Sequence, residues 1–549
     1  MLCRPNPPTM RLHCPHAPTI IRCLHHRERE SSHIAQDRTH GHGLASPDAR
    51  AWLVALLTGL AAFAAGTDTD LSLGDENYHF HKAVEFFQAG GRTAYATDYG
   101  PIVPPGIRYH DGPLWEWGLA RLWQLTGRSV VVAQAYQAFW YTLIVGFAWM
   151  AGKRLGGPAV GWWALLLATT MPAILLFGGI LLYVEGAMVA LLMLSAVLLL
   201  SGRPLLAGAA FGLAFLAKPS VAVVFPALVT AAALATDAPW RRRLAAATWA
   251  VAGVAALVLP DLWWRHVHDT NILSGYLVKK ASNTGVPAQV VALWLEPGLG
   301  SNYQTTTLLN PLDVLTHLGL PVLLGVALSI IGLVQKRDRT VLALWALAAS
   351  VLLPQAILAA MHMHTEVRYI MPIFVALILV AALALARMLE DRRWLTGAVV
   401  AAALAQALSV GGFACVERRV SPEFVEAVQA LGRLPSRGGP GFVLCPEAKV
   451  STYSGRPILW SAVNPGAFFF TWPSEKQGFL LDYYGVQYIA VPRSRIYDDT
   501  AAKHTGGYPR SFVEALPRMP YVDPFPVIDG PWMIVYRVKS KPASEAPSR

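Results

Sequence analysis

Charged residues are scarce in this chain of 549 residues: they make up 14% of the composition, whereas hydrophobic residues make up 54%. A soluble globular domain carries about 25% charged residues. The deficit excludes an ordinary water-soluble protein and indicates a chain that is solvated largely by lipid. The apolar runs agree, because Leu181–Leu200 contains one acidic residue in a length sufficient to cross a hydrocarbon core of about 30 Å.

Cysteine is scarce as well, and the five cysteines show no spacing typical of a disulfide framework or a zinc site. Neither an internal repeat nor a signal-peptide cleavage site is present, so we expect the first hydrophobic run to stay as an uncleaved anchor. Residues 1–49 are polar and rich in histidine. We expect a disordered N-terminal tail there, with a metal-binding tail or a start at Met10 as alternatives.

The net charge of +11 would suggest nucleic acid in a soluble protein. Here the basic residues cluster in short loops between apolar runs, which is the pattern of cytoplasmic loops in membrane proteins. The sequence therefore predicts membrane lipids as partners and no nucleic acid. By this criterion Arg203 and the triplet Arg241–Arg243 lie on the cytoplasmic side.

Hydropathy predicts an α-helical polytopic membrane protein with about eleven transmembrane helices. The expected spans are 50–66, 129–150, 158–177, 180–200, 204–217, 219–236, 244–262, 314–334, 340–360, 367–388 and 394–412. This gives a transmembrane domain over 50–412, with a long first outer loop at 67–128. In a bacterium the protein would be a multi-pass protein of the inner membrane, with the remainder of the chain, 413–549, in the periplasm.

Lys218 is expected at a helix break. The flanking basic groups both belong inside, so 204–236 must cross the membrane an even number of times, and Pro219 breaks helical hydrogen bonding. Two helices of about fourteen residues span roughly 21 Å each, which places their tip at membrane depth. A lysine there either meets an anion or a cavity, or extends its side chain to the interface.

The segment 413–549 predicts a small α/β domain. Ser421, Pro422 and Glu423 form a helix start with a capping residue, a first-position proline and an acid in the first turn. We expect strands at 441–445, 486–491 and 532–538, and a helix over 476–484.

The first outer loop concentrates the polar residues suited to chemistry. It reads D-E-N-Y-H-F-H from Asp75 to His81, D-Y-G-P-I-V-P-P-G from Asp98 to Gly106, and H-D-G-P-L-W from His110 to Trp115. We expect Trp115, Trp117 and Trp123 to anchor an interfacial helix rather than to stack on sugar.

The acidic pair Asp75–Glu76 resembles the motif of the GT-C superfamily, multi-spanning transferases that use polyprenyl-phosphate sugars. Among its members are protein O-mannosyltransferases, lipid A aminoarabinose transferases and dolichyl-phosphate-glucose-dependent glucosyltransferases, and the first loop is most similar to that of the last group. Further matching segments are G-L-A-F-L-A-K-P (Gly212–Pro219), T-E-V-R-Y-I-M-P (Thr365–Pro372), Y-S-G-R-P-I-L-W (Tyr453–Trp460) and Y-G-V-Q-Y-I-A-V (Tyr484–Val491). In place of the family's aspartate early in the fourth helix stands Glu185, and Val367 is inserted between the acid and the arginine of the second motif.

The resemblance implies a GT-C-like fold and a transferase that moves a sugar from a polyprenyl-phosphate donor to a lipid, glycan or protein acceptor. The leaving group is a phosphate monoester with a second pKa near 6, so it departs without a strong general acid. Such a site needs one base for the acceptor hydroxyl and cations around the phosphate.

We therefore expect Asp75 as the general base, with inversion, and Glu76 orienting the acceptor or a cation. Lys218 and Arg368 are the candidates for the donor phosphate, Arg368 because its guanidinium can bind phosphate oxygens bidentately. Glu185, about a turn and a half into its helix, either hydrogen-bonds the sugar or pairs with Lys218. The remaining candidates for substrate binding are His79, Asp98, His110, Asp111, His362, His364 and Glu366. A divalent metal is possible, and its ligands stay unassigned.

Two other functions stay open. A transporter or flippase of lipid-linked glycans would show repeats and midplane binding residues on broken helices. A non-catalytic envelope assembly protein would use its outer domain as an interaction module.

Overall fold

The computed structural model describes most of the chain from Ser46 onward. The described residues are 46–67, 74–88, 113–226, 229–230, 239–267, 311–336, 339–360, 370–417, 421–437, 441–456, 458–459, 470, 472–483, 485–499 and 507–539. The expected disordered tail lies outside them up to residue 45. The chain divides into two compact units, Met1–Leu53 and Val54–Arg549. Of the first unit the structure describes residues 46–53, where helix α2 begins.

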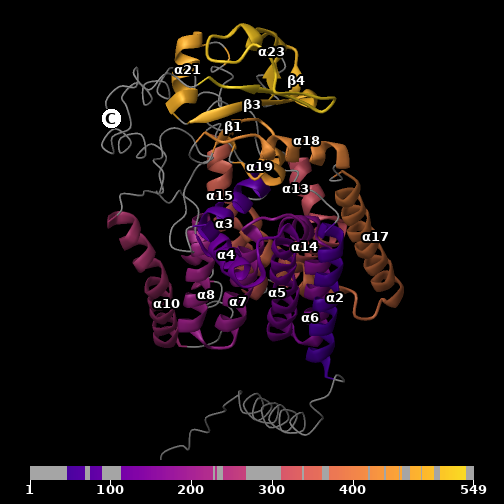
Figure 1. Ribbon diagram of the computed structural model, residues 1–549. Coiled ribbons are helices and arrows are strands. Elements are labelled where there is room, and N and C mark those ends of the chain that lie inside the picture. The colour runs from indigo at the N-terminus through magenta and orange to yellow at the C-terminus, as the bar shows by residue number, and fades with distance from the viewer. Residues whose placement is uncertain are drawn as a thin grey trace, which may run out of the picture. The chain divides into compact units, whose positions relative to one another are not determined.

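Helices make up the described chain as far as residue 417 (Figure 1). They are α2 (Pro47–Thr67), α3 (Gly74–Gln88), α4 (Leu114–Thr126), α5 (Val130–Gly156), α6 (Pro158–Thr170), a π-helical segment (Ile174–Ile180), α7 (Glu185–Leu200), α8 (Pro204–Ala217), a 3-10 segment (Pro219–Val224), α10 (Trp240–Val267), α13 (Pro311–Leu318), α14 (Leu320–Lys336), α15 (Arg339–Ala360), α16 (Met371–Met388) and α17 (Arg393–Glu417).

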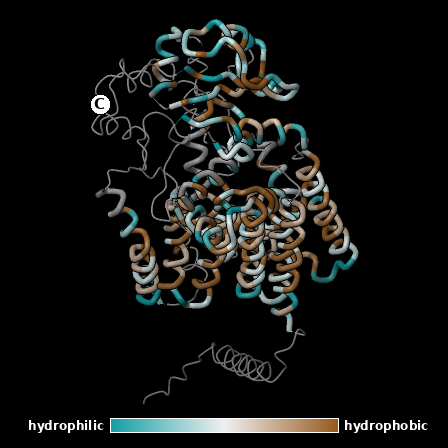
Figure 2. Tube along the Cα trace, viewed as in Figure 1, coloured by the Kyte–Doolittle hydropathy of each residue, from teal (hydrophilic) through white to brown (hydrophobic). Residues whose placement is uncertain are grey.

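Apolar helices occupy most of the positions that hydropathy predicted for the spans; the span expected at 219–236 begins with a 3-10 segment and lies partly outside the described residues. Among the described residues, five helices are long and apolar enough to cross a membrane: α2, α5, α10, α16 and α17. The pair formed by α6 and the π-helical segment gives a sixth if it counts as one span, and four shorter apolar helices accompany them. Figure 2 shows these helices as mainly hydrophobic, with hydrophilic residues gathered at their ends. The protein is a multi-pass membrane protein, and the total of about eleven spans stays a prediction.

Two prolines create the breaks in these helices. The residue before a proline is driven out of the helical region. Met171, which precedes Pro172, accordingly ends α6 with ψ 120°, and the axis turns by 73° into the π-helical segment. Lys218, which precedes Pro219, ends α8 with φ −147° and ψ 108°. The predicted break at Lys218 is therefore confirmed.

Helices α8 and α10 run parallel at close range. Gly208 abuts the carbonyl of Ala250, Gly212 faces Leu257, and Gly253 abuts the carbonyl of Leu205. Small residues at these crossings let the two backbones approach, as is common between membrane helices. Because both helices run in the same direction, the chain returns to its starting side between Ala217 and Trp240, as the even number of crossings requires.

A five-stranded sheet forms near the C-terminus, in the order β2-β1-β3-β7-β6 (Figure 1). Strand β1 pairs in parallel with β2 and β3, while β7 pairs antiparallel with β3 and β6. A second sheet consists of the parallel pair β4 and β5. The elements are α18 (Pro422–Arg433), β1 (Phe442–Leu444), α19 (Ala448–Ser454), β2 (Ile458–Leu459), α21 (Ser474–Tyr483), β3 (Val486–Pro492), β4 (Ile496–Tyr497), β5 (Tyr508–Pro509), α23 (Arg510–Ala515), β6 (Ile528–Asp529) and β7 (Met533–Arg537).

Each face of the larger sheet carries its own hydrophobic core. Along β3, Ile489 and Val491 point to one core, which includes Phe512 of α23, whereas Tyr488 and Ala490 point to the other, which includes Val428 of α18. This alternation follows the two-residue period of a strand. The strands and helices predicted for this part of the chain are thus present, in a layered α/β arrangement.

Both ends of α18 have specific caps. The Ser421 hydroxyl accepts a hydrogen bond from the Phe424 N–H at 3.1 Å, and Pro422 occupies the first turn, as predicted. At the other end the buried Arg456 guanidinium donates to the carbonyls of Leu431 (3.0 Å) and Leu434. A cation is favourable at that end of a helix because it meets the negative end of the dipole.

The cap gives a direct prediction. Replacing Ser421 by alanine removes the acceptor for the Phe424 N–H and should destabilise the first turn of α18 by about 1 kcal/mol. Hydrogen exchange of that turn in the full-length protein should then accelerate by roughly fivefold. Ser421→Asp, which keeps a capping oxygen, is the matched control and should exchange like the wild type; equal rates in the alanine variant would refute the cap.

Candidate active site

Helix α3 carries the acidic pair. Asp75 lies in the first turn of α3, and its side chain falls outside the described residues. Glu76 is fully buried, and its Oε1 accepts a hydrogen bond from the backbone N–H of Leu182 at 3.0 Å. This contact joins residues 106 positions apart in the chain. It attaches α3 to the segment that leads into α7.

That segment, residues 171–184, is here named the bend. Its backbone is irregular in an apolar part of the chain, where unpaired polar groups cost several kcal/mol each. Side chains from other helices supply partners for it and for the end of α6. These bonds run from Tyr141 Oη to Thr169 O (2.6 Å), from Gln406 Nε2 to Thr170 O (3.0 Å), from Gln137 Nε2 to Phe177 O (3.1 Å) and Gly178 O (3.0 Å), and from Leu182 N to Glu76 Oε1 (3.0 Å).

A buried ion pair stands where the bend ends. Glu185 is 0% exposed and Lys218 is 8% exposed, and the Lys218 ammonium donates to Glu185 Oε1. The sequence interpretation placed Glu185 a turn and a half into its helix, and this was wrong: Glu185 is the first residue of α7. The reason is the bend itself, because the chain leaves the helical conformation after Ile180 and Leu181 is extended.

The two carboxylate oxygens of Glu185 differ in their hydrogen-bond partners. The N-terminal position of Glu185 favours its negative charge through the helix dipole. Its second oxygen, Oε2, has no hydrogen-bond partner among the residues that the structure describes. A buried carboxylate oxygen left in this way is costly, so it is available to a donor group of a ligand.

A second buried cluster joins α3 to α4. Glu116 of α4 is 0% exposed, and its Oε1 lies 2.9 Å from His79 Nδ1 and 3.7 Å from Lys82 Nζ. His79 and Lys82 of α3 are each only 4% exposed. They are three positions apart and therefore lie on one face of the helix. Packing of Trp123 against Phe80, with ring centroids 5.1 Å apart, adds an apolar contact between the two helices.

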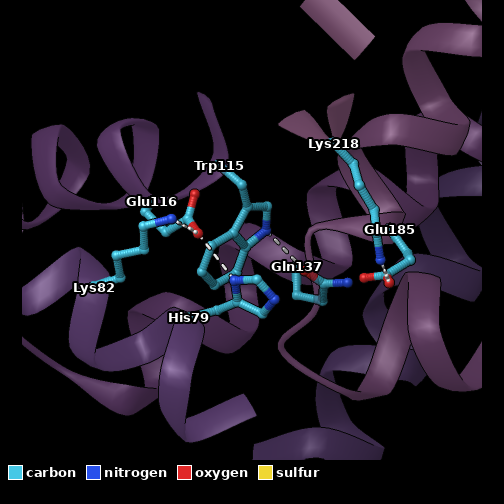
Figure 3. A network of polar contacts seen from close by, with 7 residues as sticks. All are labelled: His79, Lys82, Trp115, Glu116, Gln137, Glu185 and Lys218. Atoms are coloured by element: carbon cyan, nitrogen blue, oxygen red, sulfur yellow. Dashed lines mark hydrogen bonds and ion pairs between the residues drawn. The ribbon is translucent and has the colours of Figure 1, made fainter. Parts of the chain in front are cut away.

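Gln137 of α5 links the two clusters (Figure 3). Its Oε1 accepts from the indole N–H of Trp115 at 3.0 Å, while its Nε2 bonds the bend. A Cβ on Gly186 would lie 2.7 Å from that amide nitrogen, so Gln137 rests directly on the residue after Glu185. Figure 3 shows the side chains as one row from Lys82 through Trp115 and Gln137 to Lys218.

The structure thus brings together Glu76, His79, Glu185 and Lys218 of the predicted site. The other predicted residues, namely Asp98, His110, Asp111, His362, His364, Glu366 and Arg368, lie outside the described residues. Within the described part, no group of three or more His, Cys, Asp and Glu side chains is arranged to hold a metal ion.

Sequence reasoning missed Glu116, Lys82 and Gln137. One signal for Glu116 was available in the sequence. His79 and Lys82 share one face of a helix, and if that face is buried, its basic groups need an acidic partner. The expectation that Trp115 and Trp123 anchor an interfacial helix was also wrong, because they are 0% and 1% exposed and packed inside the protein. Trp117, at 41% exposed, is the one of the three that faces outward.

No protein-family model and no curated protein matches this chain. Among solved structures, ArnT from Cupriavidus metallidurans bound to undecaprenyl phosphate is similar with a TM-score of 0.61 and 15% identity, over 90% of this chain and 99% of that one. AglB, the oligosaccharyltransferase of Archaeoglobus fulgidus, in complex with an inhibitory peptide and a dolichol-phosphate, gives a TM-score of 0.50 and 12% identity, over 81% and 69% of the chains.

Both neighbours are membrane glycosyltransferases of the GT-C superfamily, and ArnT is a lipid A aminoarabinose transferase. The chain has the fold of these proteins, and the resemblance predicted from its motifs is confirmed at that level.

The role of Gln137 can be tested by Gln137→Met, which keeps the size of the side chain. The Trp115 N–H and two carbonyls of the bend then lose their partner, and the free energy of unfolding should fall by about 2 kcal/mol. Unfolding of the purified protein in detergent measures this. Gln124→Met, at an exposed position of α4, is the control, and a loss in Gln137→Met no larger than in the control would contradict the assignment.

Proposed function

We propose that this protein is a glycosyltransferase that moves a sugar from a polyprenyl-phosphate donor to a lipid, glycan or protein acceptor by a single inverting displacement. The reaction takes place on the outer face of the bacterial inner membrane. The observation that carries the proposal is the contact of Glu76 with Leu182, because it sets the acidic segment of α3 beside the buried Glu185–Lys218 pair.

The reaction needs a general base for the acceptor and cations for the leaving phosphate. The acceptor hydroxyl must lose its proton as it attacks the anomeric carbon, and Asp75 is the general base for this step. The leaving polyprenyl phosphate carries its negative charge away without protonation. Lys218, with Arg368 as a second cation, stabilises that charge as it develops.

The Glu185–Lys218 pair suits a site that receives an anion. In the free protein each group neutralises the other in a buried place, which a lone charge would not tolerate. An ammonium has three donors, so Lys218 can bond a donor phosphate while it retains or releases Glu185. The unpartnered Oε2 of Glu185 would accept a hydrogen bond from a sugar hydroxyl.

The other candidates have supporting roles. Glu76 holds α3 in place through the bond from Leu182 to its Oε1, and it also orients the acceptor or a cation. Asp98, His110, Asp111 and Glu366 are proposed for the acceptor side, and His362 and His364 for the rim near the donor. His79 joins the acceptor side through its position one turn after Asp75.

Two findings on the neighbours support this class of donor. The ArnT structure contains undecaprenyl phosphate and the AglB structure contains a dolichol-phosphate with a peptide. ArnT is a lipid A aminoarabinose transferase, whereas the Archaeoglobus fulgidus oligosaccharyltransferase has also been solved with an acceptor peptide, so the fold is compatible with more than one class of acceptor. The basic loops support the outer location, since the α7–α8 turn with Arg203 lies at the opposite ends of these helices from Glu185 and Lys218.

The base is tested by Asp75→Asn. With purified protein, native membrane lipids and a panel of radiolabelled polyprenyl-phosphate sugars, the wild type should transfer label and the variant should lose transfer by about 100-fold or more, while accumulating normally in membranes. Asp391→Asn, exposed between α16 and α17, is the matched control.

Full transfer by Asp75→Asn would rule out that base. Movement of the labelled lipid across the membrane by the wild type, with no sugar transfer, would favour the flippase alternative. Retained cellular function when Asp75 and Glu76 are both neutralised would favour a non-catalytic assembly protein.

The phosphate site is tested by a charge-neutral double variant, Glu185→Gln with Lys218→Gln. Removing both partners avoids a lone buried charge, so the variant should fold. Its affinity for undecaprenyl phosphate in detergent should fall by about 10- to 100-fold, the loss of one charge-assisted hydrogen bond. Lys476→Gln, at an exposed site on α21, is the control; unchanged affinity in the double variant would exclude Lys218 from the phosphate site.

A further inference from the structure

The carboxylate of Glu116 stands out because no role in the proposed reaction accounts for it. It is 0% exposed and its second oxygen has no hydrogen-bond partner among the described residues. A buried charge is strongly destabilising unless it is paired, and here the pairing groups both come from α3. A hydrophobic pair of similar size would join two helices at least as stably. What the charged cluster adds is a defined orientation.

The cluster acts on the face of α3 that bears the proposed base. Positions 75, 79 and 82 follow the spacing i, i+4, i+7, which places them on one helical face. Glu116 contacts that face through His79 and Lys82, whereas Glu76 contacts the bend. Helix α3 is therefore held on two sides, and either contact limits rotation of the helix about its axis.

The His79 ring is fixed by more than one neighbour. Its Nδ1 lies 2.9 Å from Glu116 Oε1, and edge contacts with the rings of Trp115 and Tyr183 have centroid distances of 6.2 Å each. Tyr183 belongs to the bend, two residues before Glu185. The carboxylate thus orients a ring that itself lies between α4 and the bend, as a carboxylate commonly does for a functional histidine.

We propose that Glu116 is a positioning residue of the transferase. Shared between His79 and Lys82, its carboxylate fixes the rotation of α3 and so sets Asp75 and Glu76 in register with the bend and the Glu185–Lys218 pair. The effect on catalysis rests on the proposed function; the effect on the register of α3 does not.

The test uses the double variant Glu116→Gln with Lys82→Met in the full-length protein. Removing both charges avoids an uncompensated buried charge, so the variant should fold and bind undecaprenyl phosphate with unchanged affinity. Its kcat should fall by about tenfold or more with little change in KM, because misplacement of a base slows the chemical step. The conservative variant Glu116→Asp should retain part of that kcat, and Glu390→Gln, at an exposed site, is the control.

A second readout does not depend on activity. The Leu182 N–H donates to Glu76, so its hydrogen exchange reports whether α3 keeps its register. We expect exchange of the peptide containing Leu182 to accelerate by at least about fivefold in the double variant, and exchange in α16 to stay unchanged. Wild-type exchange at Leu182, or wild-type kcat in the folded double variant, would overturn the proposal. If the double variant does not fold, Glu116→Asp is judged by the same two criteria.

The two hypotheses fail separately. If Asp75→Asn stays fully active, or the wild type transfers no sugar, the proposed function fails and the exchange result still decides whether Glu116 positions α3. If Asp75→Asn is inactive while the Glu116 variants match the wild type, only the positioning role is lost.

Discussion

Backbone polar groups in an apolar environment must find partners within the protein, and the site depends on how the bend meets this constraint. Pro172 ends α6 early, and the end of the π-helical segment that follows leaves backbone groups that need partners from outside it. Side chains of α3, α5 and α17 supply the missing partners. The residues that satisfy the bend therefore come from helices far apart in the sequence, and this requirement fixes α3 against the start of α7.

The same requirement decides where charge gathers. Glu185 is the first residue after the bend, and Lys218 is placed by its own X–Pro break at the end of α8. The two helix breaks thus place Glu185 and Lys218 next to each other, and their opposite charges neutralise each other in a buried position. Such a pair is balanced when the site is empty and can be rearranged by an incoming phosphate. In the proposed function, the two helix breaks together form the position that binds the donor phosphate.

The parts of the structure with local causes could be predicted from the sequence. Pro219 predicts the break at Lys218, and Ser421 with Pro422 predicts the start of α18, because caps and prolines act on their immediate neighbours. Contacts between distant segments could not be predicted in this way. Neither the early end of α6 nor the late start of α7 was foreseen, since π-helical geometry has no strong sequence signal. Glu116 was overlooked because its partners are in another helix, more than thirty residues away.

The proposed reaction requires an acidic segment of α3 and the cation Lys218 to face one lipid-borne phosphate. An experimental structure of the protein with undecaprenyl phosphate tests it most directly. We expect phosphate oxygens within about 3 Å of Lys218 Nζ, with the bond between Leu182 and Glu76 intact and Asp75 turned toward the same space. A phosphate bound elsewhere, with Lys218 still paired with Glu185 and Asp75 turned away from the phosphate, would refute the proposed reaction.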